Sequence, residues 1–323
     1  MAVTVVGSVA FDALETPHGK RERILGGAAT HFALAASFFA DVRVVGVVGG
    51  DFGQSEFDVF EKRGNIDTSD IERVPGERSF FWKGHYEDAM DLAHTLDTQL
   101  NVFATFDPKL SPASCASSSV FLANIQPDLQ RQVRAQCGQA TVAGLDSMNY
   151  WIESARDSLV TTIATVDIVI LNDIEVKMLT GEPNLARAAR VIRDFGPRVV
   201  VIKLGVYGAC TSTENGFFFV PGMPLETVID PTGAGDSFAG GFFGYLDSHA
   251  AGDLTDDECL RRAAVYGSVL ASFNIEAFGS ERVQRLTHEE VESRFLVFQR
   301  LTAVEHKPGR KTTAESFRQR TTV

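Results

Sequence analysis

The sequence lacks paired cysteines, long apolar runs and an excess of basic residues, the features typical of disulfide-bonded, membrane-spanning and nucleic-acid-binding proteins. Its four cysteines form no Cys-x-x-Cys pair and have no histidine at zinc-ligand spacing, so we expect reduced thiols. No apolar run reaches the ~18 residues of a membrane span, and no basic leader is visible. Lysine and arginine total 30 against 42 acidic residues, a formal net charge of −12. This balance argues against nucleic-acid and membrane partners, and we expect a cytoplasmic protein.

Short apolar, β-branched segments alternate with helical ones along the 323 residues. Such alternation predicts a parallel sheet covered by helices on both faces. Strands are predicted at residues 2–9, 42–48, 120–123, 140–145, 166–171, 199–202 and 217–220. Helices are predicted at residues 31–39, 54–63, 128–137, 151–161, 175–180, 185–195 and 256–273.

Polar residues follow several of these predicted strands. Asn124, Asp146, Asn172 and Lys203 each stand at the carboxyl end of one, and Asp12 comes shortly after the first. Open α/β sheets bind their ligands at this edge, so these side chains predict a site there. For Asp12 alone, a solvated loop position is the alternative.

An Asp-Pro-Thr-Gly-Ala-Gly-Asp segment ends at Asp236 and leads directly into an apolar stretch of helix length. Free amides at a helix start bind anions, and glycine allows close approach. Asp236 then stands where its carboxylate can take a proton from a group beside that anion. The alternative is a tight turn with Asp236 or Ser237 as the N-cap. Gly240, Gly241 and Gly244 each cost a helix about 1 kcal/mol, so a close approach is expected there.

This segment resembles the second signature of the ribokinase-like (pfkB-type) kinases. The resemblance implies that the amides of Gly233, Ala234 and Gly235 form the anion hole for the transferred phosphoryl group. It also implies that Asp236 is the catalytic base. The resemblance covers residues 1 to about 303, and the further motifs occur in the same order along the chain as in the family.

The Lys-x-Gly-x-x-Gly-Ala segment that begins at Lys203 is similar to the family motif that turns beneath the nucleotide. Asn172 and Glu175 resemble the family's Asn-x-x-Glu motif, which holds water and Mg²⁺ near the phosphates. The alternative is an Asn N-cap with Glu at N3, and both descriptions can hold together. The nucleotide-binding residues implied by the resemblance are Asn172, Lys203, Gly205, Gly208, Thr232 and Asn274.

Gly26 and Gly27 resemble the family's first Gly-Gly motif, whose backbone packs against the sugar. The family usually has Asn four residues after the second glycine, whereas this chain has His31. The change alters the hydrogen-bonding pattern expected in the pocket, so no particular sugar is named. A lone histidine beside an apolar helix face can equally be structural. The acceptor-binding residues implied are Asp12, Gly26, Gly27, His31, Asn124 and Asp236.

Residues 78–86 alternate aromatic and polar side chains, and residues 101–106 are predicted as a short strand. The resemblance implies a small β-sheet lid built from segments near 12–25 and 77–106, although residues 17–23 look polar and mobile. An edge hairpin of the main sheet is the alternative. Trp82 and Tyr86 suit stacking on a sugar or a base, and suit core or dimer packing equally well.

The sequence thus predicts a three-layer α/β/α sandwich of ribokinase-like type with a β lid. Residues 1–305 are expected to form the kinase domain, and 306–323 a polar, mobile tail. The expected activity is ATP-dependent phosphorylation of a hydroxyl on a sugar or sugar-like molecule, with Mg²⁺. A nucleoside kinase of the same superfamily and a non-catalytic binding module are the alternatives; we favour a small polyhydroxylated acceptor. A monovalent cation and a homodimer formed through the lid are left open.

Overall fold

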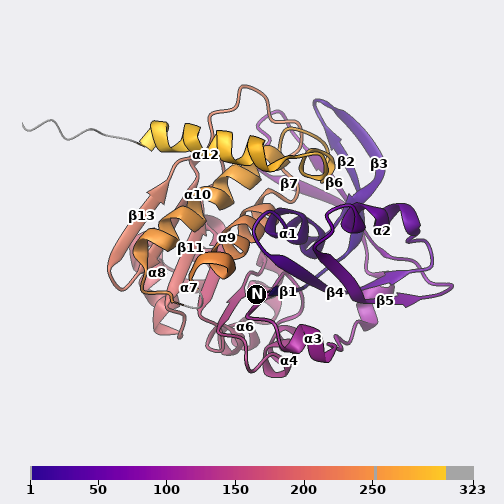
Figure 1. Cartoon of the computed structure of the whole chain (residues 1–323), viewed down its shortest axis with the longest axis horizontal. Coiled ribbons are helices and arrows are strands. Elements are labelled where there is room, and N and C mark those ends of the chain that lie inside the picture. The colour runs from indigo at the N-terminus through magenta and orange to yellow at the C-terminus, as the bar shows by residue number, and fades with distance from the viewer. Residues whose placement is uncertain (1, 251–252, 303–323) are drawn as a thin grey trace, which may run out of the picture.

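A nine-stranded sheet forms the centre of the computed structural model, which describes residues 2–250 and 253–302 (Figure 1). Its strand order is β13-β12-β11-β10-β9-β8-β1-β4-β5, parallel from β11 to β5 and antiparallel at β12 and β13. The strands are β1 (Ala2–Val6), β4 (Asp41–Gly49), β5 (Ile66–Val74), β8 (Ser119–Leu122), β9 (Val142–Leu145), β10 (Ile168–Asn172), β11 (Val199–Lys203), β12 (Ala209–Thr213) and β13 (Gly216–Val220).

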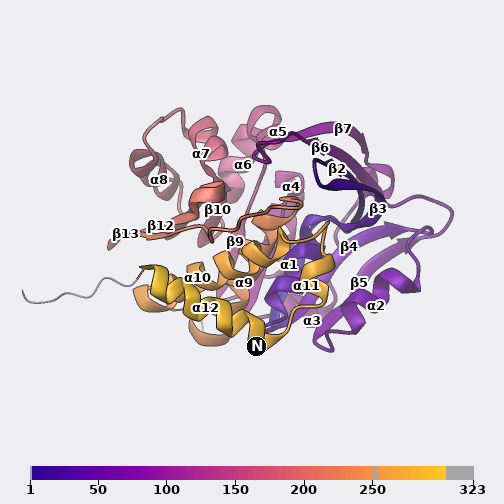
Figure 2. The ribbon, with the colours of Figure 1, turned by 90° about the horizontal axis from the view of Figure 1, so that it is seen from above.

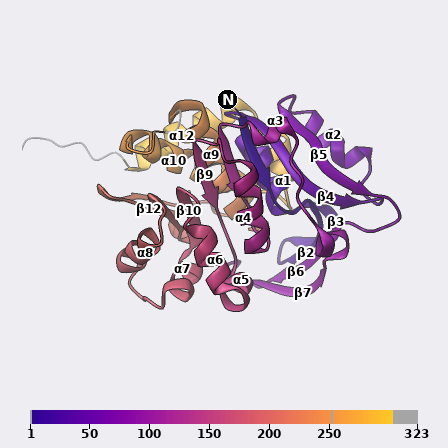
Figure 3. The same ribbon diagram turned by 90° about the horizontal axis from the view of Figure 1, so that it is seen from below.

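Helices cover both faces of this sheet (Figure 2). One apolar core joins the sheet to α1 (Ala28–Ala36), α2 (Gln54–Glu61), α9 (Ala234–Ala250), α10 (Asp257–Asn274) and α12 (His288–Thr302). A second core joins the other face to α4 (Pro127–Gln136), α5 (Asn149–Ser154), α6 (Arg156–Ile163), α7 (Asp173–Thr180) and α8 (Leu185–Asp194), as Figure 3 shows from below. Two short helices, α3 (Pro112–Cys115) and α11 (Glu281–Gln284), complete the chain's α-helices in the described ranges. The predicted three-layer sandwich is confirmed.

Helix α9 runs between α1 and α10, and its glycines make this contact close. A Cβ on Gly240 would lie 2.2 Å from the carbonyl oxygen of Phe32, and one on Gly244 would lie 2.7 Å from that of Ala36. Gly241 faces α10 in the same way. The close approach that these glycines predicted is therefore the packing of one helix on another.

A separate four-stranded sheet with the order β3-β2-β6-β7 stands beside the main sheet. Its strands are β2 (Ala10–Thr16), β3 (Gly19–Gly26), β6 (Phe80–Tyr86) and β7 (Ala93–Gln99). Strand β6 pairs with β2 in parallel and with β7 in antiparallel orientation, so an edge hairpin of the main sheet is the wrong alternative. We call these strands the small sheet.

One local prediction in this region, the strand at residues 101–106, is wrong. Residues 17–23 are polar, yet most of them belong to β3 of the small sheet, whose exposed side chains tolerate polarity because the strand is held by its backbone pairing with β2. Residues 101–106 form no strand; they contain the 3-10 helix η1 (Asn101–Thr105). Asn101 has a φ of +48°, which starts a turn rather than an extended segment, and its side chain donates to the Ser79 carbonyl at 2.8 Å.

Within the described residues, no helix combines the length and the apolar character needed to cross a bilayer. All four cysteines are free thiols. The predicted tail at 306–323 lies outside the described residues.

Candidate active site

The Gly-Ala-Gly turn lies at the start of α9, and the buried Asp230 fixes the segment before it through hydrogen bonds. Gly233 has a φ of +74°, which favours glycine, and its carbonyl accepts from the Ser237 amide at 2.9 Å. Asp230 is fully buried and accepts from the Thr232 amide at 2.9 Å and from the Gly279 amide at 2.7 Å. Amides in the first turn of a helix have no acceptor within the helix, so this turn can present donors to an anion. The Ala234 amide also donates to the Pro231 carbonyl at 3.2 Å.

Asp236 lies in the first turn of α9 and is half-buried. Burial raises its pKa above the ordinary value, while His31 and Lys203 nearby act in the opposite direction. The Lys203 ammonium also lies beside Gly235, where a Cβ would come within 2.8 Å of Nζ. A carboxyl with a raised pKa next to an anion-binding turn suits a general base.

Two further buried carboxyls lie near Lys203. Asp146, 3% exposed, follows β9, and Glu175, 6% exposed, lies in α7. Burial raises the pKa of each, Lys203 opposes the rise, and the charge of Asp236 adds to it. Oδ1 of Asp146 is buried with no hydrogen-bond partner. The sequence places Asp146 at the carboxyl edge but gives it no role; its direct position after a buried strand is the signal that could have singled it out.

Asn172 and Glu175 close a reciprocal cap at the start of α7. The Asn172 side chain accepts from the Glu175 amide at 2.8 Å, and Glu175 Oε2 accepts from the Asn172 amide at 2.7 Å. The capping alternative is therefore confirmed. It engages one oxygen of each side chain, and leaves Glu175 Oε1 and the Asn172 amide group for other partners.

No three His, Cys, Asp or Glu side chains in the described part of the chain converge closely enough to enclose a metal ion. The donors near Lys203 nevertheless fit Mg²⁺, which prefers oxygen ligands and keeps several of its waters. The carboxyls of Asp146, Glu175 and Asp236 all have raised pKa values, and one oxygen of Asp146 lacks a partner. A divalent cation held through water and phosphate oxygens would offset this crowding of acids.

The loop after β11 is a tight turn that depends on two glycines. Gly205 and Gly208 have φ values of +57° and +97°, and the Gly208 amide donates to the Gly205 carbonyl at 3.0 Å. A Cβ on Gly208 would lie 2.0 Å from the Val220 carbonyl oxygen. Val206 and Tyr207 between the glycines are strongly exposed, so the loop turns its outer side to solvent.

Thr232 and Asn274, both predicted to bind nucleotide, use their polar groups within the protein. Asn274 is fully buried and bonds to His31, Ser237 and the Thr232 carbonyl. The Thr232 hydroxyl lies 3.1 Å from the Tyr86 hydroxyl in the small sheet. Their assignment to the nucleotide stays a prediction.

Asp12 lies in β2 of the small sheet and is 4% exposed, so the solvated-loop alternative is wrong. Burial is the main cause that raises its pKa to about 8, with added repulsion from Asp230 and Asp236. Gly26 stands against this carboxyl, and Gly27, with a φ of +96°, begins α1. The structure thus brings Asp12, the glycine pair and Asp236 into one neighbourhood.

Asn124 stands at the end of β8, where its side-chain amide donates to the Met148 sulfur at 3.1 Å. Its Oδ1 is buried without a partner. The fully buried Gln130 fixes this edge, because its amide donates to the carbonyls of Leu122, Ala123 and Asp146 at 2.9–3.0 Å. Asn124 therefore has a fixed backbone and a buried side-chain oxygen without a hydrogen-bond partner.

Trp82 and Tyr86, two of the aromatic residues of β6, lie in different surroundings. Tyr86 is 6% exposed and packs with Leu14 and Phe278, so core packing explains it. Trp82 is partly exposed, lies over Gly84, and its indole nitrogen donates to the Thr95 hydroxyl at 3.2 Å. Of the two, only Trp82 keeps a surface for a ligand.

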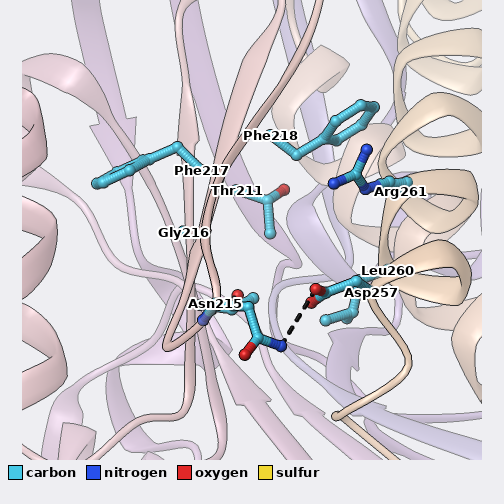
Figure 4. Close-up of a pocket in the computed structure, with 9 residues that line it drawn as sticks. Thr211, Asn215, Gly216, Phe217, Phe218, Asp257, Leu260 and Arg261 are labelled. Carbon is cyan, nitrogen blue, oxygen red and sulfur yellow. Dashed lines mark hydrogen bonds between the residues drawn. The ribbon is translucent and has the colours of Figure 1, made fainter.

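Figure 4 shows a small pocket of about 40 Å³ between β12, β13 and α10. Asn215 and Asp257 close one side of it with a 3.1 Å hydrogen bond. Strand β12 runs from Ala209, paired with Lys203, to Thr213 at this pocket, so the pocket lies at the opposite end of the strands from the site.

Comparisons with known proteins place the chain in a family. The profile of the pfkB family carbohydrate kinases matches residues 2–282. A cytidine kinase of Thermococcus kodakarensis is 30% identical over 265 residues, which cover 80% of this chain and 92% of that protein. The chain therefore belongs to the pfkB family of carbohydrate kinases.

Solved structures support the fold. A Burkholderia thailandensis nucleoside kinase in complex with inosine superposes with a TM-score of 0.73 at 20% identity, covering 91% of this chain and 98% of that one. A Vibrio cholerae fructokinase with fructose, ADP and a calcium ion gives 0.73 at 19% identity, covering 92% and 98%. As a member of this family, the chain is an ATP-dependent phosphotransferase that acts on an alcohol group.

Proposed function

We propose that this chain transfers the γ-phosphoryl group of ATP to a hydroxyl of a sugar or sugar-bearing molecule held between Asp12 and Asp236. The observation that carries the proposal is the pairing of a buried acceptor carboxyl, Asp12, with a second carboxyl at an anion-binding helix start. The two lie near enough for the charge of Asp236 to raise the pKa of Asp12. Asp12, the Gly26–Gly27 backbone and Asn124 would bind the other hydroxyls.

In this reaction Asp236 takes the proton of the acceptor hydroxyl. The hydroxyl oxygen forms a bond to the γ-phosphorus, the bond to the β–γ bridging oxygen breaks, and ADP leaves. The amides of Gly233, Ala234 and Gly235 stabilise negative charge on the transferred group, and Lys203 adds its positive charge beside them. Phosphoryl transfer asks mainly for such positioning and charge stabilisation.

The nucleotide would lie over the loop that contains Gly205 and Gly208, near Asn172. Bound Mg²⁺ supplies charge neutralisation at the phosphates. Glu175, Asn172 and Asp146 would hold it through water. A monovalent cation stays a prediction.

The small sheet would act as a lid over the acceptor, within a kinase domain of residues 1–305. Support comes from the contacts of the small sheet with the anion-hole segment. The Tyr86 hydroxyl is hydrogen-bonded to the Thr232 hydroxyl, and the Thr16 hydroxyl donates to the Ile229 carbonyl at 3.0 Å. The outer strand β7 carries the exposed Leu96 and is flanked by the exposed Leu92 and Leu100, a surface that would suit a homodimer formed through the lid.

A nucleoside acceptor is the second candidate. The similarity to a cytidine kinase and the partly exposed Trp82 in the small sheet favour it. Both candidates share a ribose-like polyol, so the residues around Asp12 would serve either one. They differ in whether a base must stack above the sugar.

An acceptor panel tests the proposal. ATP consumption is measured with pentoses, hexoses, polyols and ribonucleosides at equal concentration, with Asp236→Asn as the inactive control. We expect a hydroxylated acceptor to raise consumption far above the acceptor-free rate. A nucleoside that exceeds every free sugar tenfold would replace the carbohydrate candidate, and no stimulation by any acceptor would reject the function.

A further inference from the structure

His31 and Asn274 form a buried hydrogen-bonded pair behind the anion-hole turn. His31 Nδ1 lies 3.0 Å from Asn274 Oδ1, and the two residues are 2% and 0% exposed. His31 lies in the first turns of α1, and Asn274 is the last residue of α10. The pair thus joins the two helices that flank α9, the helix that begins with the Gly-Ala-Gly turn.

The other bonds of Asn274 fix which atom donates to which. Asn274 Nδ2 donates to the Thr232 carbonyl at 2.7 Å, and its Oδ1 accepts from the Ser237 hydroxyl at 3.1 Å. An amide oxygen cannot donate, so His31 must carry its hydrogen on Nδ1. Burial lowers the pKa of His31, with Asp236, Asn274 and Asp230 opposing it, and so favours the neutral ring.

The imidazole ring also packs against the turn itself. A Cβ on Gly233 would lie 2.4 Å from each of Cγ, Nδ1 and Cε1 of His31. Equal distances to three ring atoms mean that the flat face of the ring covers the α-carbon of Gly233. The ring therefore occupies the space where any side chain at 233 would stand, and limits how far the turn can move.

The remaining ring nitrogen does not reach an open pocket. His31 Nε2 is buried without a hydrogen-bond partner. In this arrangement His31 offers no exposed polar atom, because Nε2 is buried and Nδ1 is bonded to Asn274. Every contact of His31 described above leads to the turn or to Asn274.

We propose that His31 and Asn274 are positioning residues that hold the Thr232–Gly233 turn in the geometry needed for phosphoryl transfer. The inference rests on the proposed function, in which the Gly233–Gly235 amides stabilise the transferred group. Asn274 holds the Thr232 carbonyl and the Ser237 hydroxyl, and His31 holds the face of Gly233. Neither side chain contacts ATP or the acceptor.

A positioning role lowers kcat and leaves acceptor binding nearly unchanged. A displacement of about 1 Å costs roughly 100-fold in rate, and loss of one oxyanion donor about 10²–10³-fold. His31→Ala and Asn274→Leu should therefore lose about 100-fold in kcat, with acceptor KM within about threefold of the parent. His31→Phe keeps a ring against Gly233 but removes the Nδ1 donor, so it should lose less, about tenfold.

The matched control is His288→Ala. His288 packs edge-on against Phe38, with ring centroids 5.1 Å apart, at a cavity on another part of the molecule. Its removal deletes the same kind of side chain and should leave both kinetic constants unchanged. An acceptor KM that rises tenfold or more in His31→Ala, with kcat kept, would overturn the proposal in favour of direct acceptor contact.

A second measurement needs no acceptor and so separates this inference from the proposed function. ADP with aluminium fluoride imitates the transferred phosphoryl group, and its affinity reports on the anion hole. The variants should bind ADP as the parent does but lose the additional affinity gained with aluminium fluoride; retained affinity would overturn the inference. Should a variant fail to fold, nitrogen NMR of the parent's histidines decides the pairing, because a hydrogen on Nε2 of His31 contradicts it.

Discussion

The carboxylate of Asp12 lies directly against the α-carbon of Gly26. A Cβ at position 26 would stand 1.9 Å from Oδ2 and 2.5 Å from Cγ of Asp12. The neighbouring Gly27 is required for a different reason. Its φ is +96°, and a Cβ there would lie 2.4 Å from the Ser8 carbonyl oxygen. One glycine therefore makes room for a carboxylate, and the other allows the backbone to enter α1.

Gly26→Ala should weaken acceptor use while the protein stays folded. Residue 26 has no positive φ, so alanine fits its backbone, but the added methyl must push the Asp12 carboxylate aside. We expect kcat/KM for the acceptor to fall about 10–100-fold, as for a hydroxyl left without its partner, with ATP KM unchanged. Gly138→Ala is the control, since its Cβ would meet only the Ala135 oxygen at 3.7 Å. Equal kinetics in both variants would contradict the proposed place of Asp12.

Asp12→Asn should raise stability at alkaline pH at the cost of acceptor affinity. The pKa of Asp12 is about 8 in the folded chain and near 3.8 when unfolded, so the folded state holds the proton more tightly. This contribution is complete below pH 4 and is lost as pH rises through 8. The neutral asparagine escapes that loss. Thermal unfolding from pH 5 to 9 should show a gain in Tm for the variant that grows with pH, and a constant difference would refute the buried, protonated state.

Asp236→Asn should abolish turnover and leave ATP binding intact. A general base contributes about 10²–10⁴-fold to the rate, and the asparagine cannot take the hydroxyl proton. Burial raises the pKa of Asp236, so kcat of the parent should begin to fall at a higher pH than for an ordinary aspartate as the medium is acidified. Steady-state kinetics with the best acceptor, together with ATP binding by calorimetry, check both. Activity above a tenth of the parent would show that another group takes the proton.

Glu175→Gln should raise the Mg²⁺ concentration needed for half-maximal rate without unfolding the protein. Glutamine can still accept from the Asn172 amide, so the cap at the start of α7 is kept while the charge is removed. Magnesium titrations of activity are compared with thermal melts. Glu175→Ala loses both the cap and the charge, and serves as the comparison. A large drop in Tm for the glutamine variant, with unchanged Mg²⁺ dependence, would assign Glu175 to capping alone.

The main sheet was predictable because its strands carry their own signal. Strand β11 (Val199–Lys203) is a run of buried β-branched residues that ends in a cation, and β10 (Ile168–Asn172) is a similar buried apolar run that ends in an amide. The small sheet was harder, since β3 is polar and exists by pairing with β2. Strand β5 escaped prediction for a related reason, because polar residues break its sequence, Ile66–Val74.

The candidate site also combines features that neighbouring residues predict with contacts that only the folded chain makes. The chain by itself determined the Gly-Ala-Gly-Asp turn ending at Asp236, because anion binding at a helix start needs only adjacent residues. It also determined the reciprocal cap of Asn172 and Glu175, which are three positions apart. Tertiary structure alone decided that Asn274 turns inward to His31, and that Tyr86 meets Thr232. Those partners lie far apart in sequence, and only the packing of α1, α9, α10 and the small sheet brings their polar groups within hydrogen-bond distance.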